Sequence, residues 1–190
     1  MTHDTYRNAI AWIRVLRPLV WGGAALLLLT PWVAMRFTNE VAWTGGDFVV
    51  FGALLLFACL AFEAMARTAR LPRHLAASVL AIGTAFLLVW ANLAVGIVEE
   101  PDHPANLMFA AVLLAGVVGA AMARLHARGM AHVLLLMACL QVAAGAIAVS
   151  MDTQTPPLLV LALTAVCSAA WLLSAWLYHT AAAPPAGDQR

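Results

Sequence analysis

Residues 130–150 read MAHVLLLMACLQVAAGAIAVS, an unbroken apolar run without a formally charged side chain. At a rise of about 1.5 Å per residue, a helix of this length crosses the roughly 30 Å hydrocarbon core of a bilayer. Five further segments of the chain are also long and apolar. Their repetition predicts an all-α fold, a polytopic membrane bundle of six transmembrane helices.

Composition agrees with this fold class. The 190 residues are 64% hydrophobic and only 10% charged, and the mean hydropathy is +0.91. A soluble domain is about 45–50% apolar and about 25% charged, so one soluble core of this size could not bury the excess apolar surface. The formal net charge of +1 gives no electrostatic footprint for nucleic acid, so the bilayer is the expected partner.

Hydropathy and turn residues set the expected boundaries within a bundle that covers residues 19–179. The six helices are predicted at residues 19–35, 47–66, 75–98, 105–123, 130–150 and 157–179. Asp47 is expected to cap the second helix, and Pro104 to open the fourth, where its missing N–H costs nothing. Residues 1–18 are expected to form an amphipathic lead-in, and residues 180–190 a disordered tail.

The first apolar run can also be interpreted as a signal peptide that is cleaved, because basic residues precede it. The run is long for the apolar part of a signal peptide, and Val33-Ala34-Met35 is a poor cleavage site. We therefore expect the first helix to be retained.

The arginines predict the orientation of the spans. The chain has no lysine, and only Arg36 of its ten arginines falls on the side opposite the N-terminus. The other nine are Arg7, Arg14, Arg17, Arg67, Arg70, Arg73, Arg124, Arg128 and Arg190. The opposite side carries the acids Glu40, Asp47, Glu99, Glu100, Asp102 and Asp152. By the positive-inside rule we expect both termini of this multi-pass protein to lie in the cytoplasm.

Three polar side chains within the predicted spans are candidate binding residues, since a polar group in lipid is costly. Glu63 lies near the cytoplasmic end of its helix with Arg67 at i+4, so an ion pair with Arg67 or Arg70 competes with a role as a cation or proton ligand. Asn92 and Gln141 are each followed at i+4 by a glycine, which suits interhelical hydrogen bonding. A substrate or ion site requires that they face one shared cavity.

Small residues at intervals of four mark the fourth predicted helix as a packing surface. They are Ala111, Ala115, Gly119 and Ala123, with Gly116 beside them. Small residues at this spacing let two helices approach closely. The stripe predicts either a central packing helix or a face for a second copy or another membrane partner, although any alanine-rich helix shows such spacing.

Metal sites have weak support in the sequence. His74, His126, His132 and His179 fall near cytoplasmic helix ends and could converge on a metal, but none shows the spacing of a known metal motif. The acidic turn of Glu99, Glu100, Asp102 and His103 could bind calcium, although such turns are usually solvated. Cys59, Cys139 and Cys167 lie in apolar runs and are interpreted as packing residues. No cofactor is indicated.

Part of the chain resembles a known pattern. The segments NLAVGIVE (92–99), PANLM (104–108), AR (123–124) and RGMA (128–131) are similar to those of a family of small, uncharacterised bacterial inner-membrane proteins. In that pattern a glutamine follows in the next helix, and Gln141 fits it. The resemblance covers only the third to fifth helices, and it implies a membrane location without implying an activity.

These observations favour a small integral membrane protein with a non-enzymatic packing, accessory or assembly role. One alternative is a small transporter or channel that uses Asn92, Gln141 and Glu63. A second alternative is a membrane metal-dependent hydrolase that uses the cytoplasmic histidines. The sequence itself does not decide whether the protein is an enzyme.

Overall fold

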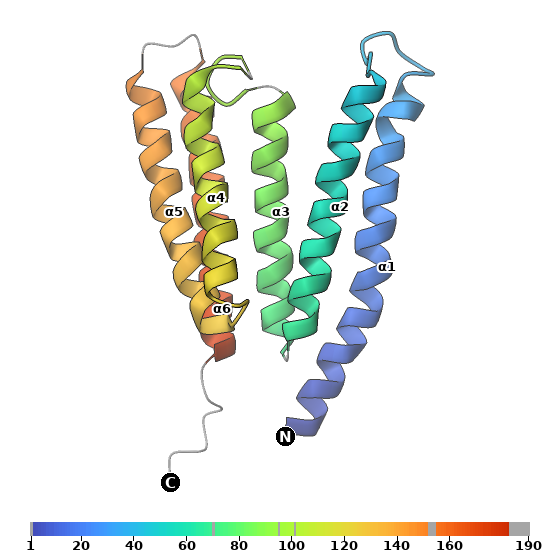
Figure 1. The fold of residues 1–190 in the computed structure, drawn as a ribbon, viewed down its shortest axis with the longest axis vertical. Helices are drawn as coiled ribbons and strands as arrows, with labels where there is room; N and C mark the ends of the chain where they lie inside the picture. The colour runs from blue at the N-terminus through green and yellow to red at the C-terminus, as the bar shows by residue number, and fades with distance from the viewer. Residues whose placement is uncertain (1, 70, 95, 101, 152–154, 183–190) are drawn as a thin grey trace. The chain divides into compact units, whose positions relative to one another are not determined.

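The computed structural model describes residues 2–69, 71–94, 96–100, 102–151 and 155–182, with side chains from residue 12 onward. In this part of the chain all regular elements are helical, which confirms the predicted all-α class (Figure 1). The elements are α1 (Thr2–Ala34), α2 (Gly45–Thr68), α3 (Pro72–Ala94), the 3-10 turn η1 (Pro104–Asn106), α4 (Leu107–Met122), α5 (Ala127–Ser150) and α6 (Pro157–Ala182). Within the described residues, six helices are long and apolar enough to cross a membrane, and the fourth of these spans, Pro104–Met122, combines η1 with α4.

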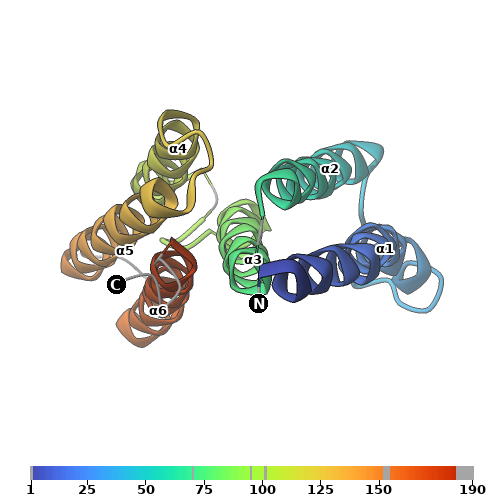
Figure 2. The ribbon, with the colours of Figure 1, turned by 90° about the horizontal axis from the view of Figure 1, so that it is seen from below.

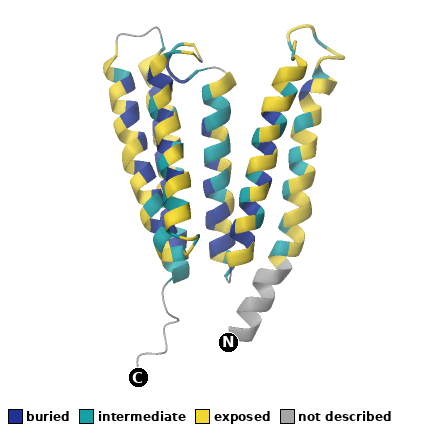
Figure 3. Cartoon of the chain, viewed as in Figure 1, coloured by how far each residue is buried: buried dark blue, intermediate teal, exposed yellow. Residues whose placement is uncertain are grey.

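The chain divides into two compact units, residues 1–75 and 76–190. The first unit contains the hairpin of α1 and α2, which pack against each other. In the second unit α5 packs against both α4 and α6 and lies between them, as Figure 2 shows. The burial pattern in Figure 3 follows these contacts, because α5 and α6 each bury a continuous face.

No boundary separates the predicted lead-in, residues 1–18, from the first predicted helix. Helix α1 runs continuously from Thr2 through Pro18 and Pro31, so the predicted lead-in and the first span form one helix. A proline removes one N–H donor and disturbs the helix locally, but membrane helices tolerate it. The part that qualifies as a span is Trp12–Ala34.

The cap of α2 is Thr44, which corrects the assignment to Asp47. The Thr44 side chain accepts a hydrogen bond from the Asp47 N–H at 3.3 Å, and the Asp47 carboxylate accepts one from the Thr44 N–H at 2.7 Å. The two residues form a reciprocal capping box. Helix α2 therefore begins at Gly45, earlier than expected.

Helix α3 ends at Ala94, so the predicted extension to residue 98 is wrong. The reason is Gly96, which adopts φ = 78°, a conformation that glycine reaches without steric cost. Its N–H donates to the Ala91 carbonyl at 3.1 Å and closes the helix. Gly96 therefore lies beyond the helix. The i+4 spacing suggested that Gly96 and Asn92 share one packing face of a helix, and this is wrong.

The remaining boundaries differ by less. Residues 104–106 form the separate turn η1, with Pro104 at its start, and α4 begins only at Leu107. Helix α5 begins at Ala127, before its predicted start at residue 130. Helix α6 continues to Ala182, and the rest of the predicted tail lies outside the described residues. The side chains of Arg7, Arg70, Asp152 and Arg190, which contribute to the predicted orientation, also lie outside them.

Candidate functional site

Glu63 is held by an arginine from another helix. Its carboxylate accepts hydrogen bonds from Arg17 of α1, from Nε at 2.7 Å and from Nη2 at 2.6 Å. The Trp21 indole N–H adds a longer bond of 3.4 Å. The predicted pairing within α2, with Arg67, is therefore wrong as the main contact, while Arg70 lies outside the described residues.

The pairing of Arg17 with Glu63 is bidentate, which gives it a defined geometry. The Glu63 side chain is 15% exposed and that of Arg17 is 52% exposed. A pair that is partly open to solvent stabilises a fold by roughly 0–1 kcal/mol. Its clearest consequence is structural, because it fixes how α1 lies against α2.

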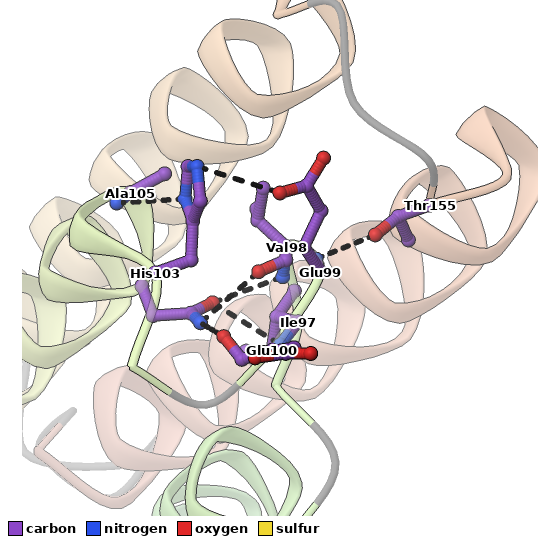
Figure 4. Close-up of polar contacts among 8 residues, drawn as sticks. Ile97, Val98, Glu99, Glu100, His103, Ala105 and Thr155 are labelled. Atoms are coloured by element: carbon purple, nitrogen blue, oxygen red, sulfur yellow. Dashed lines mark hydrogen bonds and ion pairs between the residues drawn. The ribbon is translucent and has the colours of Figure 1, made fainter.

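In the second unit the side chain of Asn106, which is buried at the end of η1, forms four hydrogen bonds with backbone groups. Its Oδ1 accepts from the backbone N–H groups of Ile97 at 3.1 Å and Val98 at 2.9 Å. Its Nδ2 donates to the carbonyls of Val98 at 3.2 Å and Glu100 at 2.8 Å (Figure 4). One amide thus uses both donors and both acceptor sites to hold the segment after α3.

Two further bonds attach this segment to its surroundings. The Asn92 side chain donates to the Asn106 backbone carbonyl at 3.1 Å, so Asn92 joins the end of α3 to η1. The N–H of Glu99 donates to the Thr155 hydroxyl at 2.6 Å, which ties in the connection between α5 and α6 (Figure 4). Glu99 has φ = 55°, a sparsely populated conformation that the surrounding bonds maintain.

The held segment carries the acidic turn on its surface. The Glu99 carboxylate lies 3.7 Å from His103 Nε2, and the two side chains face each other in Figure 4. His103 Nδ1 accepts from the Ala105 N–H at 3.2 Å, which assigns the ring proton to Nε2 in the neutral form. Glu99, Glu100, Asp102 and His103 line an open hollow of about 500 Å³. This arrangement suits solvated cations or basic groups.

Gln141 lies in α5 and is completely buried. Neither its Oε1 nor its Nε2 forms a hydrogen bond with a described protein group. The same holds for the hydroxyls of Thr164 and Ser168 and for the indole N–H of Trp171, all on the buried face of α6. An unpartnered buried polar group costs about 1–3 kcal/mol, so this set is the least satisfied part of the described fold.

The three candidate binding residues do not meet in a common arrangement of bonds. Glu63 is bonded to Arg17 and Asn92 to Asn106, while Gln141 is bonded to neither. The transporter alternative required these three side chains to share a cavity. Two of them instead have structural partners.

The small residues of the fourth span face different surroundings. A Cβ added at Gly116 would lie 2.6 Å from the Met137 sulfur of α5, and one at Gly119 would lie 2.7 Å from Val133. These two glycines therefore allow α4 to approach α5. Ala115 and Ala123 are half-buried and Ala111 is exposed.

The four candidate histidines have separate environments. His74 is buried, and His132 and His179 are exposed. His126 occupies the N-cap position of α5 without a side-chain capping bond, and its Nδ1 lies 3.2 Å from the Ala123 carbonyl. Among the described residues no three His, Cys, Asp or Glu side chains lie close enough to hold a metal ion, and this includes the acidic turn. Cys59 and Cys167 are buried and Cys139 is exposed, all as free thiols.

Sequence reasoning missed the hydroxyl groups of the spans. The Ser78 and Tyr178 hydroxyls lie 2.7 Å apart, and the Ser174 hydroxyl donates to the Ala77 carbonyl at 2.8 Å, so both bonds join α3 to α6. A signal was present, because polar side chains recur on α6 at intervals of three and four. Asn106 was not predicted from the sequence either, because its partners are backbone groups of a loop and leave no periodic pattern of residue types.

The helices and their internal contacts define a multi-pass α-helical membrane protein. Comparison of the chain with protein-family models, with curated proteins and with solved structures gave no match. The function of the chain is therefore inferred from its own geometry.

Proposed function

We propose that the protein is a non-enzymatic component of a bacterial inner membrane, with both termini in the cytoplasm, that assembles with a second copy of itself through the outward face of α4. The resemblance of its third to fifth spans to small bacterial inner-membrane proteins supports the location. The sorting of the arginines supports the orientation.

The observation that carries the proposal is the division of α4 into two different faces. Toward α5 it presents Gly116 and Gly119, which accept the side chains of Met137 and Val133. Away from α5 it presents exposed residues that are all apolar. These are Leu107, Ala110, Ala111, Leu114, Val117, Val118, Ala121 and Met122.

The exposed positions recur at intervals of three and four, which is the spacing of a helix seam that packs against another helix. Three of them are alanines, and small residues allow close contact between membrane helices. A second copy offers an identical face, so two α4 helices could pack about a two-fold axis. The bonds that occupy Glu63 and Asn92 are consistent with a packed role for these side chains.

Disulfide crosslinking in native membranes tests the proposal. The exposed thiol is first removed by Cys139→Ala, and Ala111→Cys is then introduced on the outward face of α4. The matched control is Ala143→Cys, an equally small and exposed position on α5. We expect oxidation to produce a crosslinked dimer with the α4 cysteine and little with the control.

Each outcome has a definite meaning. Equal crosslinking at both positions would indicate random collision and contradict the proposal. No crosslinking at either position would indicate that lipid alone covers α4. An adduct of Ala111→Cys with a different protein would replace the second copy by another membrane partner.

A further inference from the structure

Helices α5 and α6 bring their unpartnered polar groups to the same level. Gly145 of α5 directly faces Thr164 of α6, since a Cβ at Gly145 would overlap the Thr164 side chain and lie 2.6 Å from its Cγ2. The two helices are consecutive, antiparallel and closely packed. One turn from this contact in the same direction are Gln141 on α5 and Ser168 on α6.

Trp171 lies on the same face of α6, about one turn beyond Ser168. Gln141, Thr164, Ser168 and Trp171 therefore line one stretch of the interface, near the middle of both helices. All four side chains are at least nine-tenths buried. Together they offer the two N–H donors and the acceptor oxygen of an amide, two hydroxyls and one indole N–H.

None of these polar atoms forms a bond with a described protein group. Lipid offers no hydrogen-bond partner at this depth, so the groups need another source of partners. A bound group that serves them must both donate and accept. It must also be small, because the contact between Gly145 and Thr164 leaves no room for a bulky molecule beside it. It must be neutral, because none of the four lining side chains carries a charge.

From this geometry we propose that α5 and α6 enclose a site for bound water near mid-membrane, formed by Gln141, Thr164, Ser168 and Trp171. Water meets each requirement, since one molecule makes two to four hydrogen bonds and is commonly held by otherwise unsatisfied buried groups. The site would continue the polar face of α6 toward Ser174 and Tyr178, whose hydroxyls are bonded to α3. The water site is independent of self-association through α4.

The indole of Trp171 provides a direct probe. The test uses ¹⁵N-tryptophan-labelled, otherwise deuterated full-length protein in lipid nanodiscs, and Trp171→Phe assigns its N–H signal among the seven tryptophans. We expect a cross-peak between the Trp171 indole proton and the water resonance. In Gln141→Leu and in Ser168→Ala the cross-peak should fall at least twofold.

Ser174→Ala is the matched control on the same face of α6. Its hydroxyl already donates to a backbone carbonyl, so this variant should keep the water cross-peak even if it lowers the melting temperature. If Gln141→Leu fails to fold, Ser168→Ala, which removes a single oxygen atom, still gives the result.

The outcomes separate water from other ligands. Absence of a water cross-peak in the folded wild type would overturn the proposal, as would a cross-peak that both Ser168→Ala and Gln141→Leu leave unchanged. Native mass spectrometry of protein released from the nanodiscs provides the second arm. A stoichiometric added mass that disappears in Gln141→Leu would show that an organic molecule occupies the site and would also overturn the proposal.

Discussion

Replacing Asn106 by alanine is expected to destabilise the second unit, because buried backbone groups lose their hydrogen-bond partners. The variant loses four side-chain hydrogen bonds, to the N–H groups of Ile97 and Val98 and to the carbonyls of Val98 and Glu100. The residues at the two N–H groups are only 4% and 0% exposed. Because both residues are buried, solvent has little access to these donors once the amide is removed.

The magnitude follows from these two donors. A buried group that loses its partner costs about 1–3 kcal/mol, so two N–H groups predict a loss of about 2–4 kcal/mol after partial relaxation of the loop. The carbonyls add less, because a carbonyl has a second lone pair and Glu100 is exposed. A loss of this size is a large part of the stability of an ordinary domain.

Reversible unfolding in mixed micelles of mild detergent and dodecyl sulfate would measure this loss, with hydrogen exchange at the amides of Ile97 and Val98 as a local readout. Asn39→Ala is the control, because Asn39 is an exposed loop asparagine. A change below about 0.5 kcal/mol, the usual effect of a neutral surface substitution, together with continued protection of both amides, would refute the reasoning.

Three further substitutions test other contacts. Gly145→Ala would force α5 and α6 apart and should cost about 1–3 kcal/mol of unfolding free energy. Its control is Gly83→Ala, whose added methyl group meets nothing within 4 Å and should be neutral or stabilising. Equal effects of the two substitutions would contradict the close contact between α5 and α6. Arg17→Ala removes both bonds to Glu63 and should lower the free energy of unfolding by about 1 kcal/mol. This loss should vanish in a Glu63→Gln background, and a loss that persists there would count against the pairing. Thr44→Ala removes the cap of α2 and should cost about 1 kcal/mol, measured as a lower melting temperature, and an unchanged temperature would be the contrary result.

The number and type of the helices could be predicted from the sequence because they depend on local composition. Apolar runs of sufficient length identify spans whatever their neighbours are. The exact ends depended on finer chemistry. Thr44 rather than Asp47 is the N-cap of α2, since the two residues form a reciprocal capping box. Gly96 ends α3 because its backbone adopts a positive φ.

The partners of the polar side chains could not be predicted, because they come from distant parts of the chain. Glu63 has an arginine four residues away, yet it bonds to Arg17, which precedes it by 46 positions. Local spacing ranks Arg67 first, since a helix brings residues i and i+4 together. Only the packing of α1 on α2 places the other guanidinium within reach.

The contacts of Asn106 could not be predicted from the sequence for a different reason. Its four partners are backbone groups of the segment between α3 and η1, and such bonds leave no pattern in residue type. A polar residue directly after Pro104 and Ala105 is an ordinary helix-start signal. The structure shows that its side chain does not cap α4 and instead organises the preceding loop.

The sequence separation between the partners of these bonds determines when each bond can form during synthesis of the protein. All the bonds of the Asn106 side chain reach back at most nine positions, so this loop can close as soon as its own residues have been synthesised. The bond from Glu99 to Thr155 joins residues 56 positions apart and must wait until the whole of α5 has been inserted. The loop would therefore close in two steps during biogenesis, and a nascent chain stopped before Thr155 should already protect the amides of Ile97 and Val98 while leaving that of Glu99 exchangeable.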